Sequence, residues 1–233
     1  MIDIHSHVIP FLDDGSKTLD ASLKMLEEEK RQSVTDVICT PHFRAGVYEQ
    51  SVPETERCFR MLVSAADGIG INLYLGQEIA VTKSVAKSLN EGVRLTLAGS
   101  KYALLEFDYN NYVDISEIVY DMRIMGYSAV IAHIERYSYL KISDVEEIID
   151  TGGYVQINAE SLFLNGRARR YKKICLDLLK RNLVDFVASD IHIGRINKMA
   201  DAYSLINKKF GREQATQIFE KNPRAILENK EIR

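Results

Sequence analysis

All five histidines of the chain lie in short motifs that are typical of strand ends. His5 and His7 lie in MIDIHSH, His42 in VICTPHF, His133 in AVIAHIER and His192 in FVASDIH. Apolar, β-branched runs precede these motifs, and polar or turn-forming residues follow them. Imidazole is the commonest metal ligand in proteins. The histidines therefore indicate a metal site where the ends of several strands meet.

The spacing within two of the motifs strengthens this interpretation. His5 and His7 are two residues apart, and side chains at i and i+2 of a strand point to the same face. Asp190 and His192 repeat the spacing after an apolar run. Surface histidines, or one structural Asp–His pair, would not explain the other positions. Asp3 alternates with the first two histidines, so it is a candidate for orienting a ligand.

Acidic residues supply oxygen ligands. Asp13 and Asp14 precede Gly15, and alone this sequence predicts only a turn. Beside the histidines, one carboxylate is expected to face the site, with Asp14 favoured. Glu78 and Glu106 close apolar strand-like runs, where a carboxylate must be paired, hydrogen-bonded or coordinated if it is buried. An exposed charge at a strand end is the alternative for each.

The candidate ligands are histidine nitrogens and carboxylate oxygens, without cysteine. This set suits Mn²⁺ best, with Fe²⁺ or Zn²⁺ as alternatives. So many ligands predict a cluster of two or three metals, which in phosphoryl transfer generates a hydroxide and stabilises the attacking and leaving oxygens. The predicted metal ligands are His5, His7, Asp14, His42, Glu78, Glu106, His133, Asp190 and His192.

Two arginines follow candidate ligands closely. Arg136 follows His133 and Arg195 follows His192, and a guanidinium binds phosphate oxygens in a bidentate manner. A surface role is the alternative for both. Arg44 and Lys17 are weaker candidates. The basic stretch 167–173 (RARRYKK) is typical of a solvated helix start, and nothing in the sequence supports a docking role for it.

Strand-like and helix-like segments alternate along the chain, which predicts an α/β fold with parallel pairing. A barrel and a doubly wound sheet both satisfy this pattern. The candidate residues lie at the carboxyl ends of most strands, which favours a barrel. No linker or repeat is evident, so we expect a single domain over residues 1–233. Strands are predicted at 1–7, 34–41, 71–81, 102–107, 127–134, 153–158 and 184–190, and a short excursion or edge hairpin at 91–101.

Composition excludes several classes of protein. The net charge is −3 and the pI about 6.0, so general attraction to nucleic acid is not expected. The three cysteines are unpatterned, which argues for a reducing compartment. No apolar run is long enough to span a bilayer and no signal peptide precedes the first strand, so a cytoplasmic protein without membrane insertion is expected. Oligomeric state stays open.

Taken together, the motifs resemble the polymerase and histidinol phosphatase (PHP) family. MIDIHSH with DDG, TPH, a strand-end Glu, AHIER and ASDIH occur in that family's order, from His5 to the NPRAIL segment near the C-terminus. The chain is most similar to the branch of bacterial metal-dependent protein-tyrosine phosphatases linked to capsule and exopolysaccharide synthesis. This resemblance implies a distorted (β/α)7 TIM-like barrel, the PHP fold, with a three-metal cluster at its mouth.

The resemblance also implies a division of the ligands. It assigns one metal to His5, His7, Glu78 and Asp190, and a second to Glu78, Glu106 and His133, with Glu78 bridging. A third metal would take Asp14, His42 and His192. Arg136 and Arg195 would bind the phosphate as catalytic residues. Because the loop from His192 to Arg195 is short, whether Arg195 reaches the phosphate is open.

By the same resemblance, the chain would hydrolyse phosphotyrosine on a protein with a metal-activated hydroxide. The expected partner is a bacterial tyrosine kinase that regulates polysaccharide synthesis. One alternative is a phosphatase acting on histidinol phosphate or another small phosphomonoester. An exonuclease is disfavoured by the charge and by the lack of a basic, aromatic-lined groove. A regulatory module that binds the kinase without turnover is disfavoured by the complete ligand set.

Overall fold

The computed structural model describes residues 1–81 and 85–232, whose strands pair only in parallel. One sheet has the order β1-β2-β4 and the other β3-β5-β6-β7-β8-β9. The strands are β1 (Ile2–Ser6), β2 (Asp36–Cys39), β3 (His42–Phe43), β4 (Asn72–Leu75), β5 (Glu78–Ala80), β6 (Tyr102–Glu106), β7 (Ser128–Ile131), β8 (Tyr154–Asn158) and β9 (Phe186–Ala188).

The two sheets join into one curled wall. Thr40 and Pro41 separate β2 from β3, and Gly76 and Gln77 separate β4 from β5. Each pair therefore forms one interrupted strand of the barrel wall, and we call each such strand of the wall, interrupted or not, a stave. At the other side, a parallel bridge joins Ser6 to Ile191. Seven staves therefore surround the interior of the described chain, and the prediction of a distorted seven-stranded barrel is confirmed.

One detail of the prediction is wrong. The expected strand 71–81 breaks at Gly76, where a Cβ would lie 3.0 Å from Cγ2 of Ile38 and 3.1 Å from Cδ2 of Leu97. Of the two alternatives for 91–101, the structure shows the short excursion and not the hairpin. The chain turns there through the 3₁₀ helix η1 (Leu97–Gly99), in which Ala98 has a φ of 53°.

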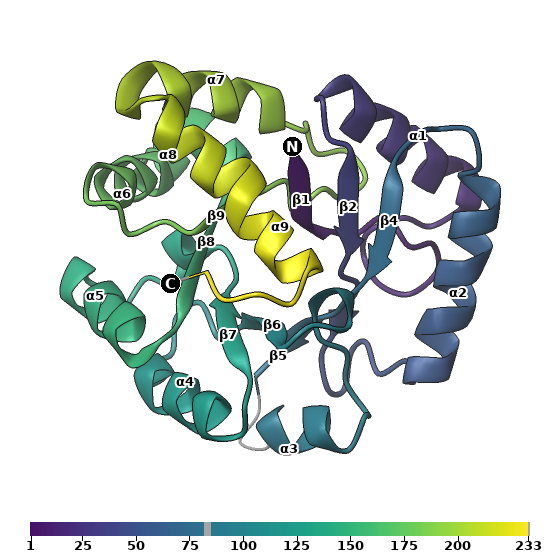
Figure 1. Ribbon diagram of the computed structural model, residues 1–233, viewed down its shortest axis with the longest axis horizontal. Coiled ribbons are helices and arrows are strands. Elements are labelled where there is room, and N and C mark those ends of the chain that lie inside the picture. The colour runs from purple at the N-terminus through teal and green to yellow at the C-terminus, as the bar shows by residue number, and fades with distance from the viewer. Residues whose placement is uncertain (82–84, 233) are drawn as a thin grey trace.

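Helices form a ring outside the strands (Figure 1). Several begin where a side chain accepts a hydrogen bond from the first turn: Thr18 before α1, Ser51 before α2 and Asp114 before α4. The helices are α1 (Leu19–Arg31), α2 (Val52–Ala65), α3 (Val85–Asn90), α4 (Ile115–Ile124), α5 (Ile142–Thr151), α6 (Arg169–Lys180), α7 (Met199–Phe210), α8 (Arg212–Thr216) and α9 (Asn222–Leu227).

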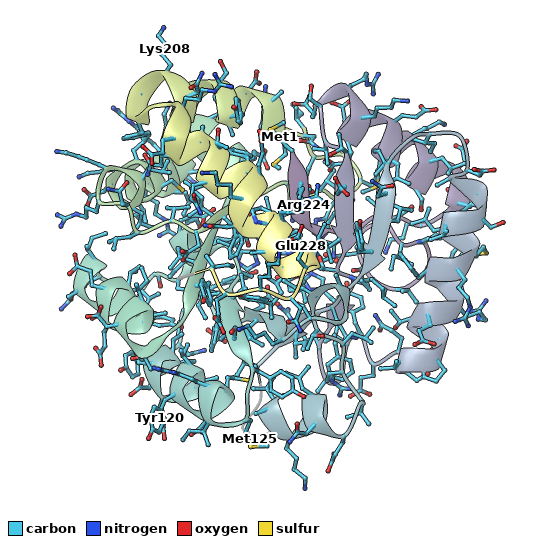
Figure 2. All side chains as sticks on the ribbon, viewed as in Figure 1. Met1, Tyr120, Met125, Lys208, Arg224 and Glu228 are labelled. Carbon is cyan, nitrogen blue, oxygen red and sulfur yellow. The ribbon has the colours of Figure 1, made fainter. Side chains whose placement is uncertain are left out.

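One end of the barrel is closed by α9, which crosses in front of the strands in Figure 1. Ile226 of this helix is fully buried and packs with the apolar residues of the barrel interior. Arg224, labelled in Figure 2, donates to Asp36 Oδ2 at the start of β2 over 3.2 Å. The amino ends of the strands are therefore covered, and the carboxyl ends remain for a site. None of the described helices has the length and apolarity needed to cross a bilayer.

A candidate metal centre at the carboxyl ends of the strands

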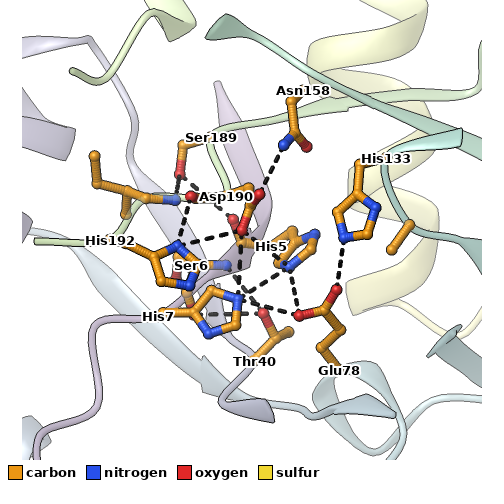
Figure 3. A network of polar contacts seen from close by, with 12 residues as sticks. His5, Ser6, His7, Thr40, Glu78, His133, Asn158, Ser189, Asp190 and His192 are labelled. Carbon is orange, nitrogen blue, oxygen red and sulfur yellow. Dashed lines mark hydrogen bonds and ion pairs between the residues drawn. The ribbon is translucent and has the colours of Figure 1, made fainter. Parts of the chain in front are cut away.

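All nine predicted ligands converge at the open end of the barrel. Figure 3 shows His5, His7, Glu78, His133, Asp190 and His192 among them. They come from six places in the wall: the end of β1 with the turn that follows it, the β2–β3 stave, the start of β5, the end of β6, the turn after β7 and the turn after β9. They form four overlapping groups, within each of which the possible ligand atoms lie no more than 4.8 Å apart. The groups are His7, Asp14, His42 and His192; His5, His7 and Asp190; His5, Glu78 and His133; and His42, Glu78 and Glu106.

Glu78 lies at the centre of this cluster and is fully buried. Its Oε2 is 3.3 Å from Nε2 of both His5 and His7, and 2.8 Å from Nδ1 of His42. Its other oxygen, Oε1, is 2.8 Å from Nε2 of His133. The two oxygens therefore face different histidines, which is the arrangement that a bridging carboxylate requires.

Asp190 divides its carboxylate between two environments. Oδ1 faces His5 and His7, at 3.6 and 3.5 Å from their Nε2 atoms. Oδ2 accepts hydrogen bonds from Arg136 Nη2 at 2.9 Å and Arg195 Nη1 at 2.9 Å. Both arginines therefore reach the site, and the short loop before Arg195 brings its guanidinium to the same carboxylate as Arg136.

The remaining predicted ligands differ in their exposure to solvent. Asp14 is half exposed, and its Oδ1 is 3.5 Å from Nε2 of His42 and 3.4 Å from Nε2 of His192. Glu106 is buried but already engaged. Arg44 donates to its Oε2 at 2.5 Å, and the Tyr109 hydroxyl donates to its Oε1. Its Oε1 is 3.8 Å from Nε2 of His133, farther than Glu78.

Residues around the cluster orient these ligands. Asp13, rather than Asp3, holds an imidazole: its Oδ2 is 2.7 Å from Nδ1 of His7 and also accepts from the backbone of His42 at 2.8 Å. Asp3 accepts from the backbone and hydroxyl of Ser189, the neighbour of Asp190, and its Oδ1 also accepts from the backbone of His5 at 3.3 Å. These contacts hold the backbone beside two predicted ligands rather than a ring, and the orienting role of Asp3 stays a prediction.

Two further orienting residues lie on β8 and were missed by the sequence reasoning. Gln156 Oε1 is 3.1 Å from Nδ1 of His5 and accepts from the backbone of His133. Asn158 Nδ2 donates to Asp190 Oδ2 at 2.7 Å. The available signal was two polar residues at i and i+2 in the otherwise apolar strand YVQIN. The contact of the Tyr109 hydroxyl with Glu106 was also not predicted, since a tyrosine after a strand is common.

The backbone is adapted to aim these side chains. His133 and Asp190 have positive φ values of 33° and 49°, a conformation that non-glycine residues rarely adopt. In each case it turns the chain at the strand end. Gly15 lies against the backbone of His7, where a Cβ would come within 2.2 Å of the carbonyl oxygen. Only glycine fits this approach.

Charges in the cluster bias its protonation. Burial alone would raise the pKa of Glu78, but the charges of His5 and His42 lower it well below its ordinary value. Burial opposes the charge on His7, yet Asp13 and Glu78 raise the pKa of His7 well above its usual range. Burial and the charge of His7 lower the pKa of His192 to about 4, so this ring is neutral at pH 7.

The donor set fits divalent metal ions. His5 Nε2 and His7 Nε2 lie 3.1 Å apart and both face the carboxylates of Glu78 and Asp190, so two nitrogens and two oxygens point to one place. Glu78 Oε2, His42 Nδ1 and His192 Nε2 are buried and make no hydrogen bond of acceptable geometry. Buried polar atoms without partners are costly, and cations bound within the cluster would satisfy these atoms. The described residues therefore offer a pre-arranged nitrogen and oxygen cage.

Comparison with known proteins adds information on relatives. A family model described as capsular polysaccharide synthesis, CpsB/CapC, matches residues 1–228. The tyrosine-protein phosphatase CpsB of Streptococcus agalactiae is 36% identical over 240 residues, covering 98% of this chain and 99% of that protein.

Solved structures extend the similarity to the fold. Crystal structures of YwqE from Bacillus subtilis and CpsB from Streptococcus pneumoniae are described as those of unique metal-dependent tyrosine phosphatases. The matching chain superposes with a TM-score of 0.92 at 30% identity, over 100% of this chain and 96% of that chain. Histidinol phosphate phosphatase from Lactococcus lactis, solved with zinc, L-histidinol and phosphate, superposes with a TM-score of 0.57 at 14% identity, over 89% and 94%. This last match shows a common fold alone.

Proposed function

The chain belongs to the CpsB/CapC family of capsular polysaccharide synthesis, and from this membership and the site we infer that it hydrolyses phosphotyrosine in proteins. The resemblance to the capsule-linked tyrosine phosphatase branch is confirmed by the same matches. The enzyme is a metal-dependent phosphoric monoester hydrolase. The observation that carries this conclusion is the convergence of five histidines and four carboxylates in one cluster, in a chain with near full-length similarity to such phosphatases.

The nine converging side chains are proposed as the metal ligands. Geometry supports a first ion between His5, His7 and Asp190, with Oδ1 of Asp190 as the ligand atom. Glu78 is suited to bridge, because its two oxygens face different histidines. Asp14, His42 and His192 would hold an ion nearer the solvent. For Glu106 to join His133, Arg44 and Tyr109 must share or release its oxygens.

Mn²⁺ is the proposed metal, since the ligands are nitrogen and oxygen with four carboxylates. When bound, divalent ions lower the pKa of water and offset the negative charge of a phosphoryl group. The neutral His192 ring keeps a lone pair available at pH 7. Asp13 and Gln156 fix the orientation of His7 and His5 through the ring nitrogens that face away from the centre.

Arg136 and Arg195 are proposed to bind the phosphate. Their side chains are 25% and 35% exposed, so they lie between the buried carboxylate of Asp190 and the solvent. Each uses one nitrogen on Asp190 Oδ2, which leaves other N–H groups of the fork for phosphate oxygens. Held in this way, two guanidinium groups would offset the charge that develops during hydrolysis.

The physiological substrate is proposed to be a bacterial tyrosine kinase that acts in capsule or exopolysaccharide synthesis. The family's role supports this proposal. A single domain over residues 1–233 is proposed to carry out the whole reaction, since the family match covers residues 1–228 and the site draws ligands from β1 to the turn after β9.

The test is release of phosphate from a phosphotyrosine peptide by the purified protein. The protein is stripped with a chelator and then supplied with Mn²⁺, Zn²⁺ or Fe²⁺. We expect activity to return with metal, most strongly with Mn²⁺, and to fall by on the order of a hundredfold in His192→Ala. Tyr120→Ala is the matched control, because Tyr120 is 57% exposed on α4 and far from the ligands.

Histidinol phosphate is assayed in parallel. If it is cleaved while the phosphotyrosine peptide is not, the metal site stands and the proposed substrate is wrong. If the chelated protein is as active as the protein with metal, the proposed mechanism is wrong.

A further inference from the structure

A groove beside the site has no part in the chemistry described above. It has a volume of about 300 Å³ and lies between α5, α6 and the turn that follows β7. Ile134, Val145 and Leu178 form its buried part, and Leu140, Ile142 and Ile174 are half-buried along its walls. We call it the α5–α6 groove. Its apolar lining and size suit one large aliphatic or aromatic side chain.

Basic side chains surround this groove. Lys141, Arg170 and Lys173 line it and are exposed. The last two belong to the stretch 167–173, which carries five cations and no acid. Among the described residues, none of these five cations forms an ion pair, although the Arg170 guanidinium lies over the Tyr171 ring, 4.8 Å from its centroid. The one acid of the groove, Asp177, is 3.4 Å from Arg181 Nε.

This charge arrangement does not stabilise the helix it lies on. Cations are unfavourable at a helix N-terminus, where the macrodipole is positive, yet α6 begins with Arg169 and Arg170 and has no acid in its first turn. Ala168, at the N-cap position, provides no side-chain cap. A positive cluster that opposes its own helix is better explained by binding of a negative partner than by folding.

The groove shares a wall with the metal centre. Ile134 directly follows His133, and the same turn carries Arg136. Tyr137 lines the groove, and its ring centroid is 6.1 Å from that of His133. On α5 the groove is lined by residues of the first turn, Ile142 and Val145, and on α6 it extends from Arg170 in the first turn to Leu178 in the third. Both helices follow strands of the barrel (Figure 1). A chain whose phosphotyrosine lies at Arg136 could therefore continue into the groove.

We infer that the α5–α6 groove docks a segment of the substrate protein that flanks the phosphotyrosine and carries acidic residues and one large apolar residue. This inference rests on the proposed function. The apolar side chain occupies the groove, and the carboxylates lie on Lys141, Arg170 and Lys173. Docking would select among phosphotyrosine proteins without taking part in the chemistry, because none of the three cations contacts a proposed metal ligand.

The experiment compares two phosphotyrosine peptides, one with flanking Asp, Glu and Leu residues and one with Asn, Gln and Ser in their place. Wild-type protein and the double variant Arg170→Glu/Lys173→Glu are assayed with Mn²⁺. In the double variant, kcat/KM for the acidic peptide should fall about tenfold, mainly through KM. Values for the neutral peptide and for p-nitrophenyl phosphate should not change. Higher ionic strength should reduce the preference of the wild type.

Lys180→Glu is the matched control. Lys180 is exposed in the last turn of the same helix, so it undergoes the same charge reversal outside the groove. Its preference for the acidic peptide should equal that of the wild type. Binding of a labelled acidic peptide without phosphate, measured by fluorescence anisotropy, reports on docking independently of turnover and should weaken only in the double variant.

Failure of this inference differs from failure of the proposed function. If wild-type protein cleaves both peptides with equal kcat/KM, the docking groove is refuted while the phosphatase stands. If it cleaves neither but the labelled acidic peptide binds and the double variant loses binding, the groove stands and the phosphatase fails. If the cations instead bind vesicles of anionic phospholipid, with no preference between peptides, the cluster is a membrane contact and the inference is overturned.

Discussion

Asp13 and Asp14 are adjacent in sequence but have different tasks. Asp14 points its Oδ1 toward His42 and His192. Asp13 is buried behind the cluster, where Oδ2 contacts His7 Nδ1 and Oδ1 accepts from the backbone of Gly15 at 2.9 Å. Burial opposes the charge on Asp13, but His7 outweighs it and lowers the pKa of Asp13 to about 2. A negative group behind an imidazole increases its basicity as a metal ligand.

Replacing Asp13 with Asn should therefore weaken metal binding. His7 Nδ1 and the backbone N–H groups of Gly15 and His42 face the two carboxylate oxygens of Asp13. An amide has only one acceptor oxygen, so in either orientation its NH₂ group faces at least one of these donors. We expect Mn²⁺ affinity to fall about 10- to 100-fold, measured by calorimetric titration. Asp20→Asn on α1 is the control, since Asp20 is exposed and pairs only with Lys24. Unchanged affinity in Asp13→Asn would refute the orienting role.

Arg136 and Arg195 allow a second test at the scale of single residues. Lysine keeps the charge but loses the planar fork that can bind Asp190 and a phosphate oxygen at once. Arg136→Lys should lower kcat by about a hundredfold, as loss of one donor to a developing negative charge does. Bound metal should stay the same by elemental analysis. If the metal content falls in parallel with kcat, Arg136 acts on Asp190 rather than on phosphate. Arg60→Lys, exposed on α2, is the control.

At the scale of structural elements, the turns at the strand ends decide where the ligands lie. The turn after β1 folds back so that Ser16 N donates to His7 O at 3.0 Å and Phe11 N donates to Ser16 O at 3.0 Å. Gly15 makes this possible by lying against His7. The turn thereby carries both Asp13 and Asp14 to the histidines of other strands.

Gly15→Ala should damage this element. The added Cβ would meet His7 O at 2.2 Å and His7 Cβ at 2.4 Å, so the backbone must move. We expect a loss of about 1–3 kcal/mol in the free energy of unfolding, measured by urea titration, together with weaker Mn²⁺ binding. Gly46→Ala is the control: its Cβ would have no atom within 4 Å, and only backbone strain at a φ of 78° remains. Equal metal affinity in both variants would contradict the argument.

The strands and turns explain which parts of the site could be predicted from the sequence. Strand periodicity was enough to place His5 beside His7, and the order of strands was enough to bring Glu78 to His133. The positive φ values of His133 and Asp190 have no sequence signal, because neither residue is a glycine that would mark a left-handed turn. The hydrogen bonds from Ser189 to Asp3 likewise have no sequence signal, because Asp3 lies on the first strand of the chain and Ser189 directly follows the last.

At the scale of the whole molecule, the barrel separates stability from chemistry. Ile226 and the interior apolar residues close the end at the amino termini of the strands, while the charged cluster occupies the other end. The strand sequences predicted this division through their polar carboxyl ends. The sequence did not reveal that α9 would serve as the closing element, because a short helix beginning at Asn222 and Pro223 carries no signal for its destination.

Metal binding should stabilise the whole barrel, because the ligands come from most of its staves and an unfolded chain cannot hold them together. At a Mn²⁺ concentration about 100 times Kd, the gain is about 2.7 kcal/mol. For a chain of this length that corresponds to a rise in Tm of about 5–10 °C by differential scanning fluorimetry, relative to protein with chelator.

Ile226→Ala should lower Tm through a loss of about 2–5 kcal/mol yet keep the metal-induced rise, since Ile226 packs at the opposite end. His192→Ala should do the reverse, with a reduced rise and little change in the metal-free Tm. If both variants lose the rise equally, the two ends of the barrel are coupled and the separation proposed here is wrong.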